Sequence, residues 1–287
     1  MNEKNISKQL YKTVGVDVGG TKIIAGLVEN GKILKSKTLP TPVYAEKDDI
    51  VKAIVDAIRL VLDDDCTGIG IGVPGLINTK EGIVHNVGNI PDFSNVPLKQ
   101  ILEKELGKTV FVNNNANCFA LGAKNFDNAK QFNNLVGLTL GTGLGGGIII
   151  KGHLYEGVGC GAGEFGYLPY YDGILEHYCS GQFFKRQFHI SGKDAATLAL
   201  SGDESALHMF NRFGFHLGDA IKIVAHFFAP EAIMLGGSIS KNFKLFEKSM
   251  WSSIHLFPYS HVVDNLVVKP ASNPEIAVVG AASLVSE

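Results

Sequence analysis

The stretch GVDVGGTKIIAGLV at residues 15–28 has a close counterpart in the second half of the chain, GLTLGTGLGGGIII at residues 137–150. Aligned without gaps, both run from a glycine through alternating residues to a glycine turn, and then into an apolar segment. The alternation and the β-branched residues predict two strands around each turn. One such hairpin is weak evidence, because any tight turn can use glycine. Two of them in two similar halves predict duplicated lobes, each presenting a turn to a shared cleft.

The two turns have the chemistry of a phosphate cradle, because a turn with little side chain lets several backbone N–H groups point at one anion. Asp17 directly precedes the first turn, where a carboxylate can orient a hydrated Mg²⁺. The predicted phosphate-binding residues are Gly19, Gly20, Thr21 and Lys22 in the first turn and Gly141, Thr142 and Gly143 in the second. Neither turn has the P-loop spacing or the dinucleotide-binding pattern before a helix. The alternative is a pair of structural hairpins, which the polar residues at both turns disfavour.

The other segments alternate between helical and strand-like patterns, which places the chain in the α/β class. Residues 47–65 carry apolar side chains at helical spacing behind acidic residues, and a long helix is predicted at about 205–228. Residues 67–84 read as a buried strand ending in a Gly/Pro loop. The stretch EAIMLGGSIS at residues 231–240 reads as a short buried strand that ends in two glycines.

Composition indicates a globular protein of two lobes without a basic surface. The chain has 287 residues, of which 45% are hydrophobic and 19% charged, and its formal net charge is -2. Lys and Arg are scattered, which argues against nucleic-acid binding. No signal peptide or membrane-spanning run is recognisable, so a cytoplasmic location without membrane contact is expected. The cysteines lack C-x-x-C spacing and are expected to be small buried or loop residues; they are Cys66, Cys118, Cys160 and Cys179.

Five segments in order resemble the ROK family of sugar kinases, which belongs to the actin-like, ribonuclease H-like superfamily of two-lobe ATPases. They are VDVGGTKIIAGLV, GIGIGVPGLIN, the stretch from GNIPDF to VNNNANCFALGA, GLTLGTGLGGGIIIKGHLYEGVGCGAGEFGY and EAIMLGGSIS. The resemblance runs from about residue 13 to the end of the chain. It implies an N-terminal tail at 1–12, an N-terminal lobe at 13–115 and a C-terminal lobe at 116–287. The lobe boundary is approximate, and the C-terminal helix can return to the first lobe.

The resemblance also implies phosphoryl transfer from ATP, with Mg²⁺, to a sugar hydroxyl, commonly the 6-hydroxyl of a hexose or N-acetylhexosamine. Homodimers are common in this family, and the implied partners are a sugar and ATP. Carried over position by position, the sugar-site residues are Asn89, Asn114, Asn115, Glu164, Tyr167 and Glu176, and the residues near adenosine are Gly236 and Gly237. An exposed loop acid is the alternative interpretation for Glu176. His153, His177, His216 and His226 lack a partner pattern and are interpreted as structural.

The sequence departs from the family first at the zinc motif, Cys-x-Cys-Gly-x-x-Gly-Cys after a Gly-His pair. The histidine position holds Tyr167, and the stretch LPYYDGILEHYCSG at residues 168–181 contains only Cys179. A tetrahedral zinc needs four Cys or His ligands, so no zinc is predicted. The aromatic side chains of Tyr167, Tyr170 and Tyr171 are expected to pack this loop instead. Tyr167 also offers a hydroxyl where the histidine would touch the sugar.

The second departure concerns the catalytic base. The resemblance places the family's aspartate base, beside the sugar-binding asparagine, at Asn115, and an amide cannot accept the sugar proton. General-base catalysis contributes about 10²–10⁴-fold, whereas a loose phosphoryl-transfer transition state depends largely on positioning and charge. Turnover is therefore expected to be impaired without being abolished.

Three explanations for Asn115 stay open at this point. The position was changed to trap substrates in an active kinase, the protein is a degenerate kinase, or another carboxylate takes the proton. Asp92 in NIPDF is the candidate for that carboxylate, and Asp127 is interpreted as a solvated loop residue.

The leading hypothesis is a ROK-type, glucokinase-like kinase impaired at Asn115, and its rival is a non-catalytic sugar sensor. A ROK-type transcription repressor is disfavoured, because only about a dozen residues precede the first strand, fewer than one helix-turn-helix needs.

Overall fold

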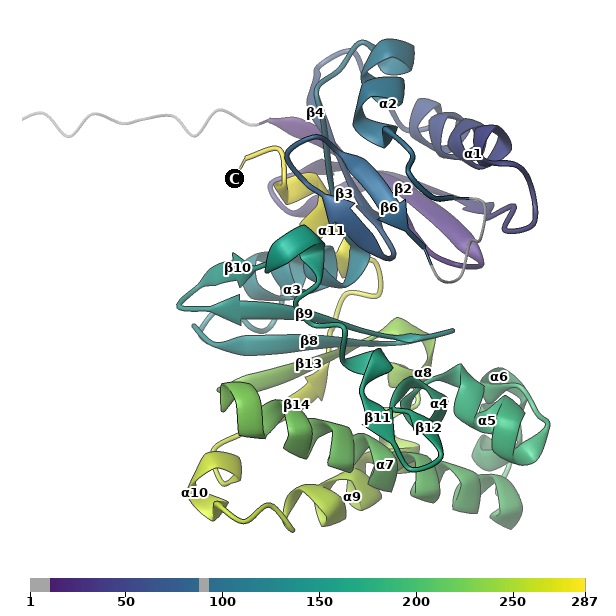
Figure 1. The fold of residues 1–287 in the computed structure, drawn as a ribbon, viewed down its shortest axis with the longest axis vertical. Helices are drawn as coiled ribbons and strands as arrows, with labels where there is room; N and C mark the ends of the chain where they lie inside the picture. The colour runs from purple at the N-terminus through teal and green to yellow at the C-terminus, as the bar shows by residue number, and fades with distance from the viewer. Residues whose placement is uncertain (1–10, 88–92, 287) are drawn as a thin grey trace, which may run out of the picture. The chain divides into compact units, whose positions relative to one another are not determined.

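The computed structural model describes residues 11–87 and 93–286, which form two compact units of mixed α/β structure (Figure 1). Unit 1 holds the described residues up to Asn115 together with those from Ala281 onward. Unit 2 holds Ala116–Gly280. Each unit is built around one five-stranded mixed sheet.

The sheet of unit 1 has the order β3-β2-β1-β4-β7. Its strands are β1 (Lys12–Val18), β2 (Lys22–Glu29), β3 (Lys32–Pro40), β4 (Cys66–Val73) and β7 (Val110–Asn114). The first three are antiparallel neighbours, whereas β1, β4 and β7 run parallel. The carboxyl ends of β1, β4 and β7 therefore meet at one edge, the usual place for ligands in sheets of this kind.

Helices α1 (Lys47–Arg59) and α2 (Leu98–Leu106) lie beside this sheet (Figure 1). The periodic apolar residues Ile50, Ile54 and Ile58 are fully buried, as amphipathic spacing requires. At the other end of the chain, the Ala281 carbonyl packs so closely on Gly70 of β4 that a Cβ there would collide with it. Glycine at this position therefore lets the C-terminal residues of unit 1 pack directly on the sheet.

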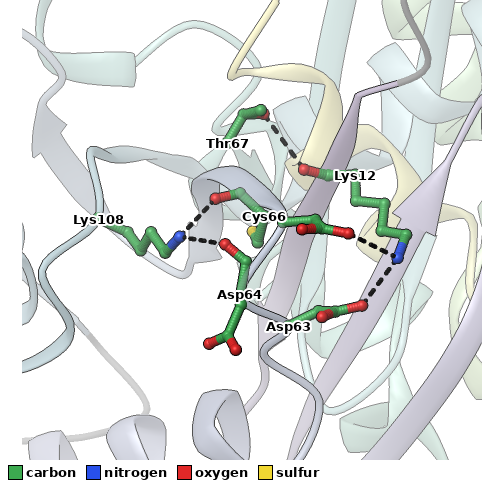
Figure 2. A network of polar contacts seen from close by, with 7 residues as sticks. Lys12, Asp63, Asp64, Cys66, Thr67 and Lys108 are labelled. Carbon is green, nitrogen blue, oxygen red and sulfur yellow. Dashed lines mark hydrogen bonds and ion pairs between the residues drawn. The ribbon is translucent and has the colours of Figure 1, made fainter.

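The helix expected at 47–65 ends earlier, at Arg59, and the acidic residues after it hold a turn into β4. Lys12 points toward Asp63 (Figure 2), and its Nζ lies 2.8 Å from Asp63 Oδ2. The same Nζ lies 3.7 Å from Asp65 Oδ2. On the other side of the turn, Lys108 Nζ donates to the carbonyls of Asp64 and Cys66 at 2.9 and 2.8 Å. These contacts with residues distant in sequence stop the helix where its own periodicity would let it continue.

Unit 2 repeats the sheet plan with the order β10-β9-β8-β13-β14. Its strands are β8 (Leu135–Leu140), β9 (Leu144–Ile150), β10 (His153–Tyr155), β13 (Ala232–Gly236) and β14 (Val267–Pro270). Helices α7 (Glu204–Phe228) and α9 (Phe243–Ile254) lie on one face of this sheet, and α3 (Asn115–Phe126) on the other (Figure 1). Fully buried phenylalanines fill the core beneath α7 and α9; they are Phe183, Phe184, Phe210, Phe213 and Phe246.

None of the described helices is both long and apolar enough to cross a membrane. The elements not yet named are short. They are β5 (Leu76–Asn78), β6 (Ile83–Asn86), η1 (Val158–Cys160), η2 (Phe165–Tyr167), β11 (Pro169–Tyr170), β12 (Gly173–Ile174), α4 (Glu176–Cys179), α5 (Gly181–Phe188), α6 (Gly192–Leu200), α8 (Gly237–Ser240), α10 (Ser260–Val263) and α11 (Ile276–Ser283). All four cysteines are free and buried, as the sequence indicated.

Candidate active site

The first glycine turn joins β1 to β2, and Thr41 holds it through hydrogen bonds to its backbone carbonyls. The Gly19 N–H donates to the Lys22 carbonyl at 2.9 Å, which closes the turn. Thr41 donates from its hydroxyl to the Gly19 carbonyl at 2.7 Å and from its N–H to the Thr21 carbonyl at 3.1 Å. The side chains of Thr21 and Lys22 are exposed. The turn is thus fixed through its backbone while its hydroxyl and its cation remain available to a ligand.

Asp17 lies at the carboxyl end of β1, beside Gly72 of β4. Burial raises its pKa to about 6, and the charge of Lys22 acts in the opposite direction. Within residues 11–87 and 93–286, no hydrogen bond or ion pair engages the Asp17 carboxylate. A partly buried carboxylate without a protein partner, next to a glycine turn, fits a hydrated divalent cation, which would supply the missing counter-charge.

The three asparagines lie at the same edge of the sheet, where β7 ends and α3 begins. Asn113 and Asn114 are buried, and Asn114 donates its side-chain amide to the Gly75 carbonyl at 3.0 Å. Asn115 donates its side-chain amide to the Val18 carbonyl at 3.3 Å. This bond ties Asn115 to the strand that leads into the first glycine turn. An ionised aspartate could not make it, because a carboxylate has no proton to donate.

Two of the predicted residues of the sugar segment, Asn89 and the alternative base Asp92, lie outside the described residues. Asp127 lies within them, in the bend after α3 as the sequence indicated, and its half-buried carboxylate also has protein partners. It accepts hydrogen bonds from the Ser272 N–H at 2.8 Å, from the Ser272 hydroxyl and from the Asn273 N–H. Asp127 therefore holds the connection that follows β14, a partner that lies too far along the chain for sequence reasoning to identify.

The second glycine turn joins β8 to β9 and is fixed by backbone contacts. The Gly141 N–H donates to the Gly143 carbonyl at 3.0 Å, and the Gly181 N–H, at the start of α5, donates to the Gly141 carbonyl at 2.8 Å. A Cβ on Gly141 would point into open space, and the Thr142 side chain is exposed. The turn therefore leaves room beside its backbone, as a phosphate-binding turn requires.

The adenosine candidates Gly236 and Gly237 lie at the same edge of the unit 2 sheet. Gly236 pairs with Thr139 of β8, two residues before the turn. Gly237 has a φ of 83°, and a Cβ there would collide with the Leu140 carbonyl. Both the left-handed backbone and the close approach demand glycine at 237. The two glycine segments of unit 2 are thus brought side by side.

The three sugar-site candidates of unit 2 also come together. Burial raises the pKa of Glu164, and the charge of Glu176 raises it further. Burial and the same two carboxylates raise the pKa of the Tyr167 hydroxyl, although 62% of this residue is exposed. A Cβ on Gly166, between Glu164 and Tyr167 in the chain, would lie 3.5 Å from the Glu176 side chain, so Glu176 lies beside this segment. Two carboxylates and a phenol close together can accept and donate several hydrogen bonds to sugar hydroxyls.

Glu176 is not an exposed loop acid. Its Oε2 accepts from the Leu144 N–H at 2.9 Å, and its Oε1 accepts from the Gln182 side-chain amide at 2.6 Å. Ser180 supports this arrangement, because its hydroxyl donates to the Glu176 carbonyl at 2.7 Å and accepts from the Gln182 N–H at 3.1 Å. Gln182 and Ser180 were not anticipated from the sequence; the Ser-Gly-Gln stretch that starts α5 is a helix-cap signal that could have indicated the serine.

The loop after Tyr167 is packed by aromatic side chains. Tyr170 lies at ring-centroid distances of 4.6 Å from Tyr171 and 5.1 Å from Tyr178, whereas Tyr167 itself faces solvent. His216, one of the histidines interpreted as structural, lies against Tyr170 at 5.8 Å. Throughout the described ranges, no group of three or more His, Cys, Asp or Glu side chains could hold a metal ion.

Comparison with known proteins identifies relatives over nearly the whole chain. A glucokinase from Thermotoga maritima is 35% identical, with 96% of this chain and 98% of that protein covered. An N-acetyl-D-glucosamine kinase from Shigella boydii is 32% identical, with 86% and 91% covered. Among solved structures, a ROK family glucokinase from Streptomyces griseus in complex with glucose and AMPPNP superposes with a TM-score of 0.86 at 30% identity, covering 95% and 98% of the two chains.

Solved structures of ROK sugar kinases superpose on this chain, so the predicted two-lobe, actin-like ATPase fold is confirmed. The family model of the ROK family matches residues 13–287, almost the entire chain. This protein belongs to the ROK family.

Proposed function

We propose that this protein transfers the γ-phosphoryl group of ATP to a hydroxyl of a hexose or N-acetylhexosamine, and that the acceptor is the 6-hydroxyl. The observation that carries the proposal is the hydrogen bond from Asn115 to Val18. It joins the segment that resembles the family's sugar site to the strand that enters the first phosphate turn. The relatives support the reaction, because they include glucokinases and N-acetylglucosamine kinases.

Each unit contributes its own groups to the proposed reaction. In unit 1, the turn at Gly19 and Gly20 binds phosphate oxygens through its N–H groups, and Asp17 would hold Mg²⁺ through water. In unit 2, Gly141–Gly143 and the Gly236–Gly237 pair bind the remaining phosphate and the adenosine. ATP supplies the phosphoryl group, and Mg²⁺, when bound, offsets the charge that develops on it.

Unit 1 and unit 2 each hold polar side chains suited to sugar hydroxyls. Asn114, held by the Gly75 carbonyl, donates to a ring hydroxyl and Asn115 orients the acceptor hydroxyl. Glu164 and Glu176 accept from the other hydroxyls, and Tyr167 donates to one of them. The partly buried Glu164 makes a stronger hydrogen bond than it could in water, because the low local dielectric strengthens electrostatic contacts.

Asn115 sets the expected rate. A side-chain amide can position the acceptor hydroxyl but cannot take its proton, so the proton must pass to water or to another carboxylate. Loss of the base predicts slow turnover rather than none, because positioning and charge stabilisation supply most of the catalysis of phosphoryl transfer. A protein of this kind would retain sugar and nucleotide binding.

The alternative function is a sugar sensor that binds without turnover. The same hydrogen bond from Asn115 to Val18 favours it, because it satisfies the side chain in a way that the family's carboxylate could not. Sensor and kinase differ in one respect that can be measured, namely whether a carboxylate at position 115 produces catalysis.

A coupled ADP-release assay on a panel of hexoses and N-acetylhexosamines tests the proposal. The unmodified protein and Asn115→Asp are compared, with Asn113→Asp as a matched control that adds the same carboxylate two residues earlier in the chain. We expect Asn115→Asp to phosphorylate one sugar at least about 10²-fold faster than the unmodified chain, and Asn113→Asp to give no gain.

The outcomes of this assay separate the hypotheses. Equal activity of the unmodified chain and Asn115→Asp would mean that another group accepts the proton. Sugar binding by calorimetry without phosphorylation by either protein would establish the sensor. Failure to bind both ATP and every sugar of the panel would overturn the kinase and the sensor together.

We further propose, from the family resemblance alone, a cytoplasmic homodimer that uses Mg²⁺ and binds no nucleic acid. Light scattering after size exclusion would test the dimer, and titration of the assay with Mg²⁺ and EDTA would test the metal.

A further inference from the structure

The loop that carries Glu176 is anchored to the helical layer of unit 2 by one phenol. Tyr170, on β11, donates its hydroxyl to Asp219 Oδ2 on α7 at 2.6 Å. The Tyr170 hydroxyl oxygen also lies 3.1 Å from His216 Nδ1, one turn earlier on α7. A hydrogen bond of this length to a carboxylate belongs to the strong, charge-assisted class. The loop is therefore held at this residue by a polar contact as well as by ring packing.

The Asp219 carboxylate is a rigid anchor, because it is held from two helices. Its Oδ1 accepts from the Ser253 hydroxyl of α9 at 2.6 Å and lies 2.9 Å from Lys222 Nζ of α7. Burial acts to raise the pKa of Asp219, yet the hydrogen bonds from Ser253, Tyr170 and Lys222 outweigh burial and hold this pKa below its usual value. The carboxylate thus stays ionised while it faces the loop.

The position of Tyr170 passes to Glu176 through a short antiparallel ladder. Tyr170 pairs with Gly173, and Pro169 pairs with Ile174, so β11 and β12 form a small hairpin. The Leu175 N–H donates to the Leu168 carbonyl at 2.9 Å, which extends the ladder to the residue before Glu176. On the other side, Tyr170 lies three residues after Tyr167. A shift at Tyr170 would therefore displace both sugar-site residues.

We propose that the Tyr170–Asp219 hydrogen bond is a positioning contact that holds Tyr167 and Glu176 in place for the sugar. This sequence lacks the family's zinc motif, and the Tyr170–Asp219 hydrogen bond holds the loop in its place. Tyr170 and Asp219 touch neither substrate; they act through the loop. The inference rests on the proposed function insofar as it concerns the sugar.

The test is Tyr170→Phe, which removes one hydroxyl and keeps the ring contacts. The matched control is Tyr171→Phe, which makes the same change on the neighbouring, largely exposed ring. Losing a hydrogen bond to a charged group should raise the sugar Kd and KM by about 10-fold, while the KM for ATP changes less than about 2-fold. Asp219→Asn should act in the same direction, and Tyr171→Phe should leave both constants unchanged.

A second readout, amide hydrogen exchange over residues 168–181, does not depend on catalysis. We expect faster exchange in Tyr170→Phe and wild-type exchange in Tyr171→Phe. Unchanged sugar affinity in Tyr170→Phe would overturn the positioning role. If the unmodified protein binds no sugar, the proposed function fails, but the exchange rates still test whether the Tyr170–Asp219 hydrogen bond holds the loop. Unchanged protection in Tyr170→Phe would overturn that role, and reduced protection would support it.

Discussion

The two glycine hairpins occupy the same place in their sheets but differ in turn length and in chemistry. Each forms the middle of a five-stranded sheet in which an antiparallel hairpin precedes two parallel strands. Each turn is closed by the N–H of its first glycine, from Gly19 to the Lys22 carbonyl and from Gly141 to the Gly143 carbonyl. The first turn has four residues between the paired Val18 and Ile23, whereas the second has three between the paired Leu140 and Leu144, so the gapless sequence alignment does not carry over to the strand register.

The two hairpins differ in which of their polar groups form hydrogen bonds within the protein. Asp17 corresponds to Thr139, and Lys22 corresponds to Leu144. In the second hairpin, the Leu144 N–H is occupied by Glu176, and Thr139 lies within 3.5 Å of the Gly145 carbonyl. In the first, the Asp17 carboxylate has no hydrogen bond or ion pair with any residue that the structure describes. The comparison teaches that the two hairpins share a strand plan, whereas the first has a carboxylate and a lysine at positions where the second has a threonine and a leucine.

The largest expected effect is the loss of turnover in Asp17→Asn, compared with Thr139→Val at the corresponding position of the other hairpin. Removing a preorganised charge from the proposed phosphate site should lower kcat by about 10²–10³-fold. The threonine variant, which loses one long internal contact, should retain kcat within about 3-fold. Measurements are best made in the Asn115→Asp background if that variant is the more active. Equal losses at the two positions would break the asymmetry between the hairpins.

The second prediction concerns the stability cost of the same charge. The folded-state pKa of Asp17 is about 6 against an ordinary value of 3.8, so the folded chain holds its proton more tightly than the unfolded chain. Stability must then fall as the pH rises from about 4 to about 6 and become level above it. At pH 7 the cost amounts to up to about 3 kcal/mol.

Asp17→Asn lacks this dependence, so it should equal the unmodified protein near pH 4 and exceed it in unfolding free energy by pH 7. Urea unfolding in EDTA, without nucleotide, measures the difference at each pH. A difference that stays constant from pH 4 to pH 7 would show that the carboxylate is solvated like any surface acid.

Local patterns in the sequence were enough to predict both hairpins, because strand alternation and glycine turns are properties of neighbouring residues. The contacts that it could not reveal join distant segments. Asp127 and Ser272 lie 145 residues apart, and Tyr170 and Asp219 lie 49 residues apart. The early end of α1 has the same origin, since Asp63 pairs with Lys12 across 51 residues. Periodicity describes one element at a time and carries no record of such partners.

The third prediction compares two glycines of unit 2. Gly237 needs a positive φ and leaves no room for a Cβ, whereas Gly141 faces open space. Gly237→Ala should lower the unfolding free energy by about 1–3 kcal/mol. Gly141→Ala should change it by less than about 0.5 kcal/mol and instead weaken ATP binding several-fold, because its methyl group enters the proposed phosphate space. Thermal unfolding and nucleotide titration measure the two effects, and a stable Gly237→Ala would contradict the close approach.

The smallest effect is expected when the hydrogen bond between the Leu144 N–H and the Glu176 carboxylate, next to the second turn, is weakened. In Glu176→Gln, the amide oxygen can still accept from the Leu144 N–H, but the charge is lost and one oxygen becomes a donor that faces the Gln182 amide. The unfolding free energy should fall by about 1 kcal/mol, the usual scale of one hydrogen bond.

Gln182→Ala provides the matched control for Glu176→Gln, because it removes the other partner and leaves the carboxylate on Leu144. If the carboxylate braces the second turn, Glu176→Gln should weaken nucleotide binding and sugar binding, whereas Gln182→Ala should affect neither by more than about 2-fold. If Glu176→Gln alters sugar affinity alone, the second turn is rigid through Gly181 without it. The two hairpins would then differ in their side chains, while in each of them the backbone alone holds the turn.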